Sequence, residues 1–125
     1  MMNIKDAANT SGLSVDTIRF YEKAGMLPPI RRDARGWRSF GPEAVDWLRN
    51  LERLRATGMP MKDMRRFAVL VHLGDPALSD AAVERLAILE SHSQRLVQRQ
   101  SDLDACKAYL SKKIAIYRNL EGNEQ

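Results

Sequence analysis

Apolar residues recur at helical spacing in successive stretches of the chain, and residues that start or end helices separate the stretches. In the first stretch, Ile4 and the alanines at positions 7 and 8 share one face, and Asn3 can cap the helix that carries them. Gly12 ends this helix, and Ser14 can cap a second one. Two short helices around a glycine-bearing turn predict a helix-turn-helix.

The stretch from Leu13 to Tyr21 holds the Ser14 cap and most of the second helix, and this helix carries charged and aromatic residues on its outer face. If Ile18 points inward, a turn of about 100° per residue places Val15 and Tyr21 beside it. The outer half then carries Asp16, Arg19, Phe20 and Lys23. An outward arginine next to an outward aromatic ring suits a helix that lies against DNA, since such a helix meets base edges in the major groove. An ordinary amphipathic surface helix is the alternative that this pattern leaves open.

The next segment changes character and predicts a β-hairpin. Pro28 and Pro29 exclude a helix, Gly36 suits a hairpin tip, and Trp37 and Phe40 alternate with polar residues. The segment is also strongly basic, with arginines at positions 31, 32, 35 and 38. A short basic hairpin beside such a helix is a wing that reaches phosphates or the minor groove. A solvated arginine-rich loop is the alternative.

Two further amphipathic helices follow the hairpin. Pro42 after Gly41 starts the first, whose apolar stripe is Ala44, Trp47, Leu48, Leu51 and Leu54. Gly58 ends it, and Pro60 starts the second, whose stripe is Met61, Met64, Phe67, Ala68 and Val71. The triplet Gly74-Asp75-Pro76 ends this helix in turn. We expect Trp47 and the neighbouring methionines in the core, where methionine fills irregular gaps, and not at a metal site.

The C-terminal part predicts one long helix with a heptad repeat. Residues 77–121 contain neither Gly nor Pro, and Ser79 can cap the start. A helix of about 40 residues is roughly 60 Å long, so its apolar seam cannot be satisfied within a chain of this size. The seam has a polar centre, which can specify register, and predicts a coiled-coil dimer. Its apolar residues are Leu86, Leu89, Leu96, Leu103, Leu110, Ile114 and Tyr117.

The distribution of charge separates the N-terminal part of the chain from the long C-terminal helix. Residues 1–75 hold 13 Lys/Arg against 9 Asp/Glu, whereas residues 76–125 hold 7 of each, so the whole net charge of +4 lies in the N-terminal part. We therefore expect a DNA-binding domain over 1–75 and a neutral dimerisation helix over 76–125. No apolar run approaches the length of about 20 residues that a membrane span needs. Polar residues also interrupt the first ten positions, so we expect no signal peptide there. We expect a cytoplasmic protein without membrane contact.

With these segments in view, the chain resembles the MerR family of bacterial transcription regulators. The matching segments are G-L-S-V-D-T-I-R-F-Y-E-K-A-G-M-L-P-P (Gly12–Pro29), R-G-W-R-S-F (Arg35–Phe40), L-R-A-T-G-M-P (Leu54–Pro60) and the C-terminal heptads. The resemblance implies an all-α fold class, with a winged helix-turn-helix head and an antiparallel coiled-coil homodimer. It also implies binding to a palindromic promoter site in double-stranded DNA, beside RNA polymerase, with distortion of an overlong spacer to control transcription.

The helix-turn-helix, the wing and the resemblance together define a set of candidate DNA-binding residues. Arg19 is expected to contact bases, and Arg35 and Arg38 to contact mainly phosphates. The full set is Ser14, Asp16, Thr17, Arg19, Phe20, Tyr21, Arg35, Gly36, Trp37, Arg38 and Lys62.

The chain departs from the family pattern at several positions. Phe20 stands where a tyrosine is usual, so one phosphate-contacting hydroxyl is absent, and Trp37 replaces a common tyrosine. The P-P-I-R and A-T-G-M-P sequences most resemble the small aldehyde- or stress-responsive branch. Arg53 stands where that branch typically carries a cysteine, so the resemblance does not extend to aldehyde sensing through that thiol.

The sequence predicts no metal site, cofactor or enzyme activity. One cysteine, Cys106, and two distant histidines, His72 and His92, do not form a set of three or four ligands. Cys106 lies beside the heptad seam, so we expect its side chain to be partly buried and to have a structural role. No catalytic grouping can be assembled from the sequence. An excisionase-like or architectural DNA-binding protein is the alternative function, although small winged-helix excisionases usually lack a long dimerisation helix. The inducing signal and the operator stay open.

Overall fold

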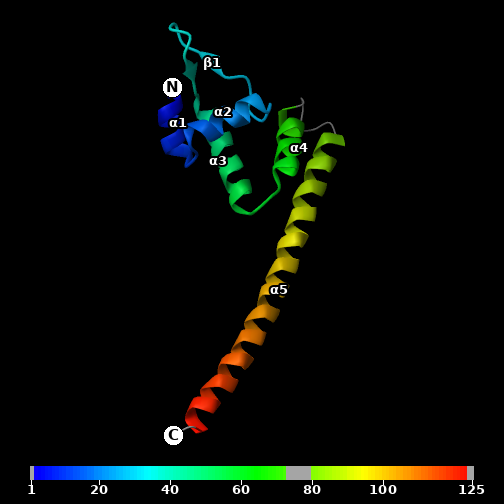
Figure 1. Ribbon diagram of the computed structural model, residues 1–125. Helices are drawn as coiled ribbons and strands as arrows, with labels where there is room; N and C mark the ends of the chain where they lie inside the picture. Colours follow the sequence, from blue (N-terminus) through cyan, green and yellow to red (C-terminus); the bar gives the residue numbers. More distant parts are fainter. Residues whose placement is uncertain (1, 73–79, 124–125) are drawn as a thin grey trace. The chain divides into compact units, whose positions relative to one another are not determined.

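The computed structural model describes residues 2–72 and 80–123, and the chain divides into two compact units, Met1–Ile88 and Leu89–Gln125. The order of elements is α1 (Ile4–Ser11), α2 (Val15–Lys23), β1 (Arg31–Arg32), β2 (Arg38–Ser39), α3 (Pro42–Ala56), α4 (Met61–His72) and α5 (Asp80–Asn123), as Figure 1 shows. A mostly helical fold with a small two-stranded wing is therefore confirmed. The expected cap at Ser79 and the expected stop at Gly74-Asp75-Pro76 lie outside the described residues.

The helix-turn-helix forms because local signals at both helix starts agree with the packing. The Asn3 side chain accepts a hydrogen bond of 2.8 Å from the Asp6 amide, and the Ser14 hydroxyl accepts one of 3.0 Å from the Thr17 amide. Both are N-cap bonds that satisfy otherwise unpaired amides of the first turn. Between the helices, Gly12 takes a left-handed conformation with φ of 81°, which glycine adopts without strain. The predicted caps and turn are therefore confirmed.

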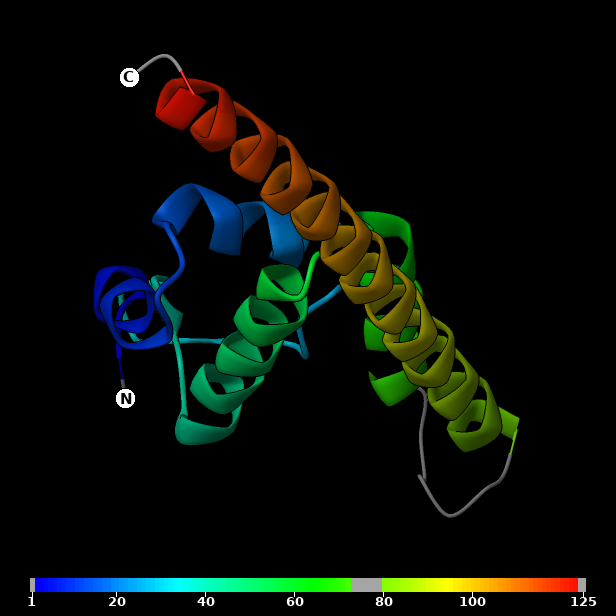
Figure 2. The same cartoon turned by 90° about the horizontal axis from the view of Figure 1, so that it is seen from below.

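The core of the head lies between α1, α2 and α3, which Figures 1 and 2 show side by side. Its largest fully buried side chains include Ile18 and Tyr21 from α2 and Leu48 and Leu51 from α3. Each helix buries one face, so packing of amphipathic faces accounts for most of the helical stability. Val45 and Leu70 are buried as well, although the predicted stripes omitted both.

The wing is a hairpin joined to the body of the head at its base. β1 and β2 pair antiparallel, with Arg31 opposite Ser39 and Arg32 opposite Arg38. Next to β2, Phe40 is buried, and its backbone exchanges hydrogen bonds of 2.7 and 2.9 Å with Met2. The N-terminal residues thus pair with the base of the wing, which fixes the direction in which the hairpin leaves the head.

Helices α3 and α4 pack through aromatic side chains. The Trp47 indole donates a hydrogen bond of 2.7 Å from Nε1 to the Met26 carbonyl, and its ring stacks nearly parallel to Phe67 at 6.4 Å. Trp47 is only partly buried, so its expected place in the core is correct in part. Met64 is buried as expected, but Met61 is 40% exposed, and its predicted place in the apolar stripe is wrong because it lies in the first turn of α4.

Helix α5 begins beside α4 and continues for 44 residues. In its first turns, a bidentate ion pair joins Arg66 of α4 to Glu84, with nitrogen–oxygen distances of 2.8 and 2.9 Å. Along the rest of the helix, the heptad residues are exposed in this single chain, from 37% for Leu96 to 64% for Tyr117. Cys106 is exposed too, so the partial cover expected for it is absent from the single chain. Within the described part of the chain, no helix combines the length and apolar character needed to cross a bilayer.

Candidate nucleic-acid interface

Helix α2 presents an exposed face that carries the predicted contact residues. Asp16, Arg19 and Lys23 are exposed, and the Phe20 ring is 51% exposed although it is a large apolar group. The hydroxyls of Ser14 and Thr17 lie 2.8 Å apart, and the Ser14 hydroxyl also caps the helix. The first turn is therefore held rigidly, with its N-terminal end available to a ligand. This is the end of a recognition helix that meets base edges.

The tip of the wing is ordered by its own hydrogen bonds. The Asp33 carboxylate accepts bonds of 2.9 and 3.0 Å from the amides of Arg35 and Trp37, and Gly36 takes a φ of 80°. Arg32 donates from Nη1 to the Gly36 carbonyl at 2.8 Å, which braces the hairpin from one side. The structure thus favours a preformed wing over the solvated loop that the sequence left open.

Aromatic and basic groups meet at this tip. The guanidinium of Arg35 lies over the Trp37 ring at 5.2 Å from its centroid, and the ring is 61% exposed. A cation held over an indole face keeps its charge and its hydrogen-bond donors available. The wing therefore offers a flat apolar surface and a positive charge in one place.

An ion pair connects the wing to α2. Arg38 donates from Nε to a Glu22 carboxylate oxygen at 2.6 Å, and the two side chains are 30% and 29% exposed. The pair joins residues that are 16 positions apart, and no local sequence pattern marks such a contact, so the sequence did not point to Glu22. Arg38 thus reaches from the wing to α2.

A hollow of about 370 Å³ lies between the start of α1, the exposed face of α2 and the wing. Arg19 from α2, Arg32 and Arg38 from the wing and Lys5 from α1 contribute basic side chains to its lining. Trp37 and Gly36 complete the side formed by the wing. Lys5 was not predicted, since one lysine in a first helical turn carries no signal of its own. The structure thus gathers four cations from three elements around one hollow.

Two predicted contact residues lie elsewhere. Tyr21 is fully buried, so its prediction as a DNA contact is wrong. The residue belongs to the inner face of α2, beside Ile18. Burial raises the pKa of its phenol above the ordinary value of 10.0, against a lowering by Arg55, and Glu52 adds to the rise. Lys62 is exposed in the first turn of α4 and does not line the hollow.

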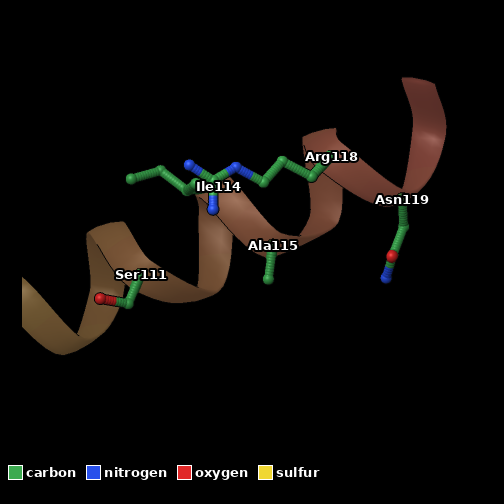
Figure 3. Close-up of a pocket in the computed structure, with 5 residues that line it drawn as sticks. All are labelled: Ser111, Ile114, Ala115, Arg118 and Asn119. Atoms are coloured by element: carbon green, nitrogen blue, oxygen red, sulfur yellow. The ribbon is translucent and has the colours of Figure 1, made fainter. Parts of the chain in front are cut away.

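The described residues contain no cluster of three or more His, Cys, Asp or Glu side chains that could hold a metal ion. A larger surface hollow, of about 420 Å³, lies on α5 between Ser111, Ile114, Ala115, Arg118 and Asn119. Figure 3 shows that these residues come from one helix, with Arg118 extending back along it. A single helix supplies only one wall, so this hollow is part of an open helix face.

Comparison with known proteins agrees with this geometry. The family model of MerR HTH family regulatory proteins matches residues 2–68. An uncharacterised HTH-type transcriptional regulator of Haemophilus influenzae is 37% identical over 90% of this chain and 80% of its own length. The regulator CueR of Escherichia coli is 30% identical over 97% of this chain and 95% of its own length.

Solved structures resemble the chain along most of its length. A MerR family regulator from Listeria monocytogenes has a TM-score of 0.79 at 32% identity, covering 94% of this chain and 86% of that one. HiNmlR, a MerR family regulator that lacks the sensor domain and was solved bound to promoter DNA, has a TM-score of 0.75 at 33% identity. That match covers 96% of this chain and 92% of HiNmlR.

A winged helix-turn-helix head with a basic exposed face defines a class of DNA-binding proteins. Within that class, the chain belongs to the MerR family and is a transcriptional regulator.

Proposed function

We propose that this regulator binds a palindromic promoter site as a homodimer and controls transcription by distorting the DNA between its two half-sites. The observation that carries the proposal is the hollow lined by Lys5, Arg19, Arg32 and Arg38, beside the exposed face of α2. Cations that converge from three elements match the dense negative charge of a duplex backbone. The protein would act in the cytoplasm, where promoter DNA and RNA polymerase are present.

Within the head, the two parts of the interface have separate tasks. Arg19 and Phe20 lie exposed on α2, where a major-groove helix reads hydrogen-bond donors, acceptors and methyl groups. The remaining predicted contacts on α2 are Ser14, Asp16 and Thr17. Arg35, Gly36 and Trp37 at the wing tip meet the sugar-phosphate backbone or the minor groove, which fixes the register of the head on the duplex. Sequence preference therefore comes from α2 and most of the salt-dependent affinity from the wing.

Dimerisation occurs through α5. Large apolar residues at heptad spacing stay exposed in the single chain over this helix, and an exposed stripe of this kind marks an interaction surface. The chain's own repeat supplies the matching surface, because a seam of leucines is self-complementary in a two-fold dimer. We propose an antiparallel arrangement, in which the polar centre at Ser93, Gln100 and Lys107 sets the register.

Two heads on a stiff connector account for the control of transcription. A protein that binds both half-sites at a fixed separation can use the binding energy to bend and untwist the DNA between them. The deformation brings two promoter elements into a geometry that RNA polymerase can use. Membership of the MerR family supports the proposed partnership with RNA polymerase.

The experiment that tests the proposal is footprinting on the DNA upstream of the protein's own gene, with transcription measured on the same fragment. We expect protection of an inverted repeat, enhanced cleavage between the half-sites from distortion, and a change in transcript level. Protection without any change in transcription would favour the architectural alternative. An absence of specific protection would contradict the proposal.

A further inference from the structure

A second pocket lies on the head, between α3 and α4 and away from the wing. Its volume is about 290 Å³, at the lower end of the range for small-molecule sites. Four partly buried apolar side chains form its floor: Trp47, Leu54, Phe67 and Val71. Three exposed polar residues form its rim: Asn50, Arg53 and Thr57. An apolar floor with a few polar groups at the edge is the usual composition of a ligand site.

The aromatic wall of this pocket is held in place from several directions. The Trp47 indole is fixed by its hydrogen bond of 2.7 Å to the Met26 carbonyl and by the edge of His72, whose centroid lies 5.0 Å away. On another side, Phe67 stacks against Trp47 with an interplanar angle of 13°. Because contacts within the protein fix this wall, a planar group binds against it with little reorganisation.

Among the described residues, the charge at the rim has no ionic partner. On α3, Arg49 pairs with Asp46 at 3.5 Å and Arg55 pairs with Glu52 at 2.8 Å, each with an acid three residues earlier. Arg53 has Asn50 at that spacing, and its guanidinium makes no ion pair or hydrogen bond within residues 2–72 and 80–123. An exposed guanidinium next to an apolar floor presents two parallel donors that match a carboxylate.

We propose that this pocket binds a small aromatic carboxylic acid, with its ring against Trp47 and its carboxylate on Arg53. The size of the pocket suits a single ring, and Asn50 can donate a second hydrogen bond from its side-chain amide. This proposal assigns Trp47 to a ligand surface, whereas the sequence favoured a place in the core. The pocket belongs to the head alone, so ligand binding does not depend on the proposed contacts with DNA.

Binding can be followed on the full-length protein without DNA by the two indole N–H signals in a proton–nitrogen NMR spectrum, with benzoate as the probe. The chain has two tryptophans, so Trp47 reports on the pocket and Trp37 in the wing serves as an internal reference. We expect benzoate to shift the Trp47 signal saturably and to leave the Trp37 signal in place. Benzamide, which has the same ring without the charge, should bind at least tenfold more weakly.

Matched variants on α3 test the role of the charge. Arg53→Gln should weaken benzoate binding at least tenfold, whereas Arg49→Gln, one turn away, should bind as the wild type does. Both substitutions are at exposed positions, and an unchanged spectrum elsewhere will verify folding. Equal binding of benzoate and benzamide, or unchanged binding in Arg53→Gln, would overturn the proposal. The proposal would also be overturned if the Trp47 signal did not shift with benzoate but shifted with protein concentration. A second copy of the chain would then cover the pocket.

Discussion

Arg38 in the wing donates a hydrogen bond of 2.6 Å to Glu22 on α2, so the hairpin and the recognition helix are joined at a partly buried ion pair. Arg38 also lines the basic hollow, so the pair links the wing to α2 at the edge of that hollow. A wing that is held in the bound geometry before contact loses less conformational entropy on binding. We therefore propose that Glu22 positions the wing through Arg38.

This relationship predicts a non-additive mutant series. Glu22→Gln and Arg38→Ala should each weaken DNA binding, and the double variant should bind no worse than Arg38→Ala, since Glu22 acts through the arginine. Fluorescence anisotropy on a specific duplex and on a random duplex would measure these affinities. Asp46→Asn, which breaks an exposed pair on α3, is the control and should bind as the wild type does. Additive losses in the double variant would show that Glu22 acts independently of Arg38.

The recognition helix and the wing should respond differently to loss of an arginine. Arg19→Ala should relax sequence preference and weaken specific binding by about 1–3 kcal/mol, because it removes a base contact. Arg35→Ala should weaken specific and random binding alike and reduce the slope of affinity against salt concentration, because it removes a phosphate contact. Affinities on both duplexes at several salt concentrations would separate the two effects. The assignment would be reversed if Arg35→Ala changed base preference and Arg19→Ala did not.

Disruption of the heptad seam should separate the protomers. Leu103 is 63% exposed in the single chain and occupies the middle of the repeat, so Leu103→Lys should produce monomers or aggregates. Sedimentation equilibrium at micromolar concentration should give the dimer mass for the wild type. Ala105→Lys, on the opposite side of the heptad frame, is the matched control and should stay dimeric. A folded wild-type monomer at these concentrations would contradict the dimer proposal.

The contact between α4 and the start of α5 should give a pH-dependent contribution to stability. The Arg66 guanidinium hydrogen-bonded to Glu84 holds the pKa of that carboxyl below its ordinary value of 4.5. A lowered folded-state pKa stabilises the protein above the unfolded value, and this contribution disappears as the pH falls through the lower, folded value. Wild-type Tm should therefore slightly exceed that of Glu84→Gln at neutral pH, and the two should converge below pH 4.5. An equal difference in Tm at neutral and strongly acidic pH would argue against this ion pair.

The elements of the head could be predicted from the sequence because their signals are local. Asn3 and Ser14 cap helices within three residues of themselves, Pro42 starts α3, and Gly36 takes the left-handed conformation that a hairpin tip requires. These effects act between neighbours along the chain, so a single sequence contains them.

Contacts between distant elements could not be predicted in this way. The pairing of Met2 with Phe40, the ion pair of Glu22 with Arg38 and the place of Lys5 at the hollow depend on how the elements pack. Tyr21 shows that prediction can fail within a single helix. The family signature suggested that it contacts DNA, whereas helical periodicity suggested that it is buried. The structure agrees with the periodicity.

We propose that the two heads of a dimer read an inverted repeat through α2 and the wing. Selection of bound sequences from a random duplex library by the wild-type protein tests it most directly. We expect the wild type to enrich two inverted half-sites at a fixed separation, and Arg19→Ala to lose base preference within each half-site. Enrichment of a single half-site, of no sequence, or of the same repeat by Arg19→Ala would contradict it.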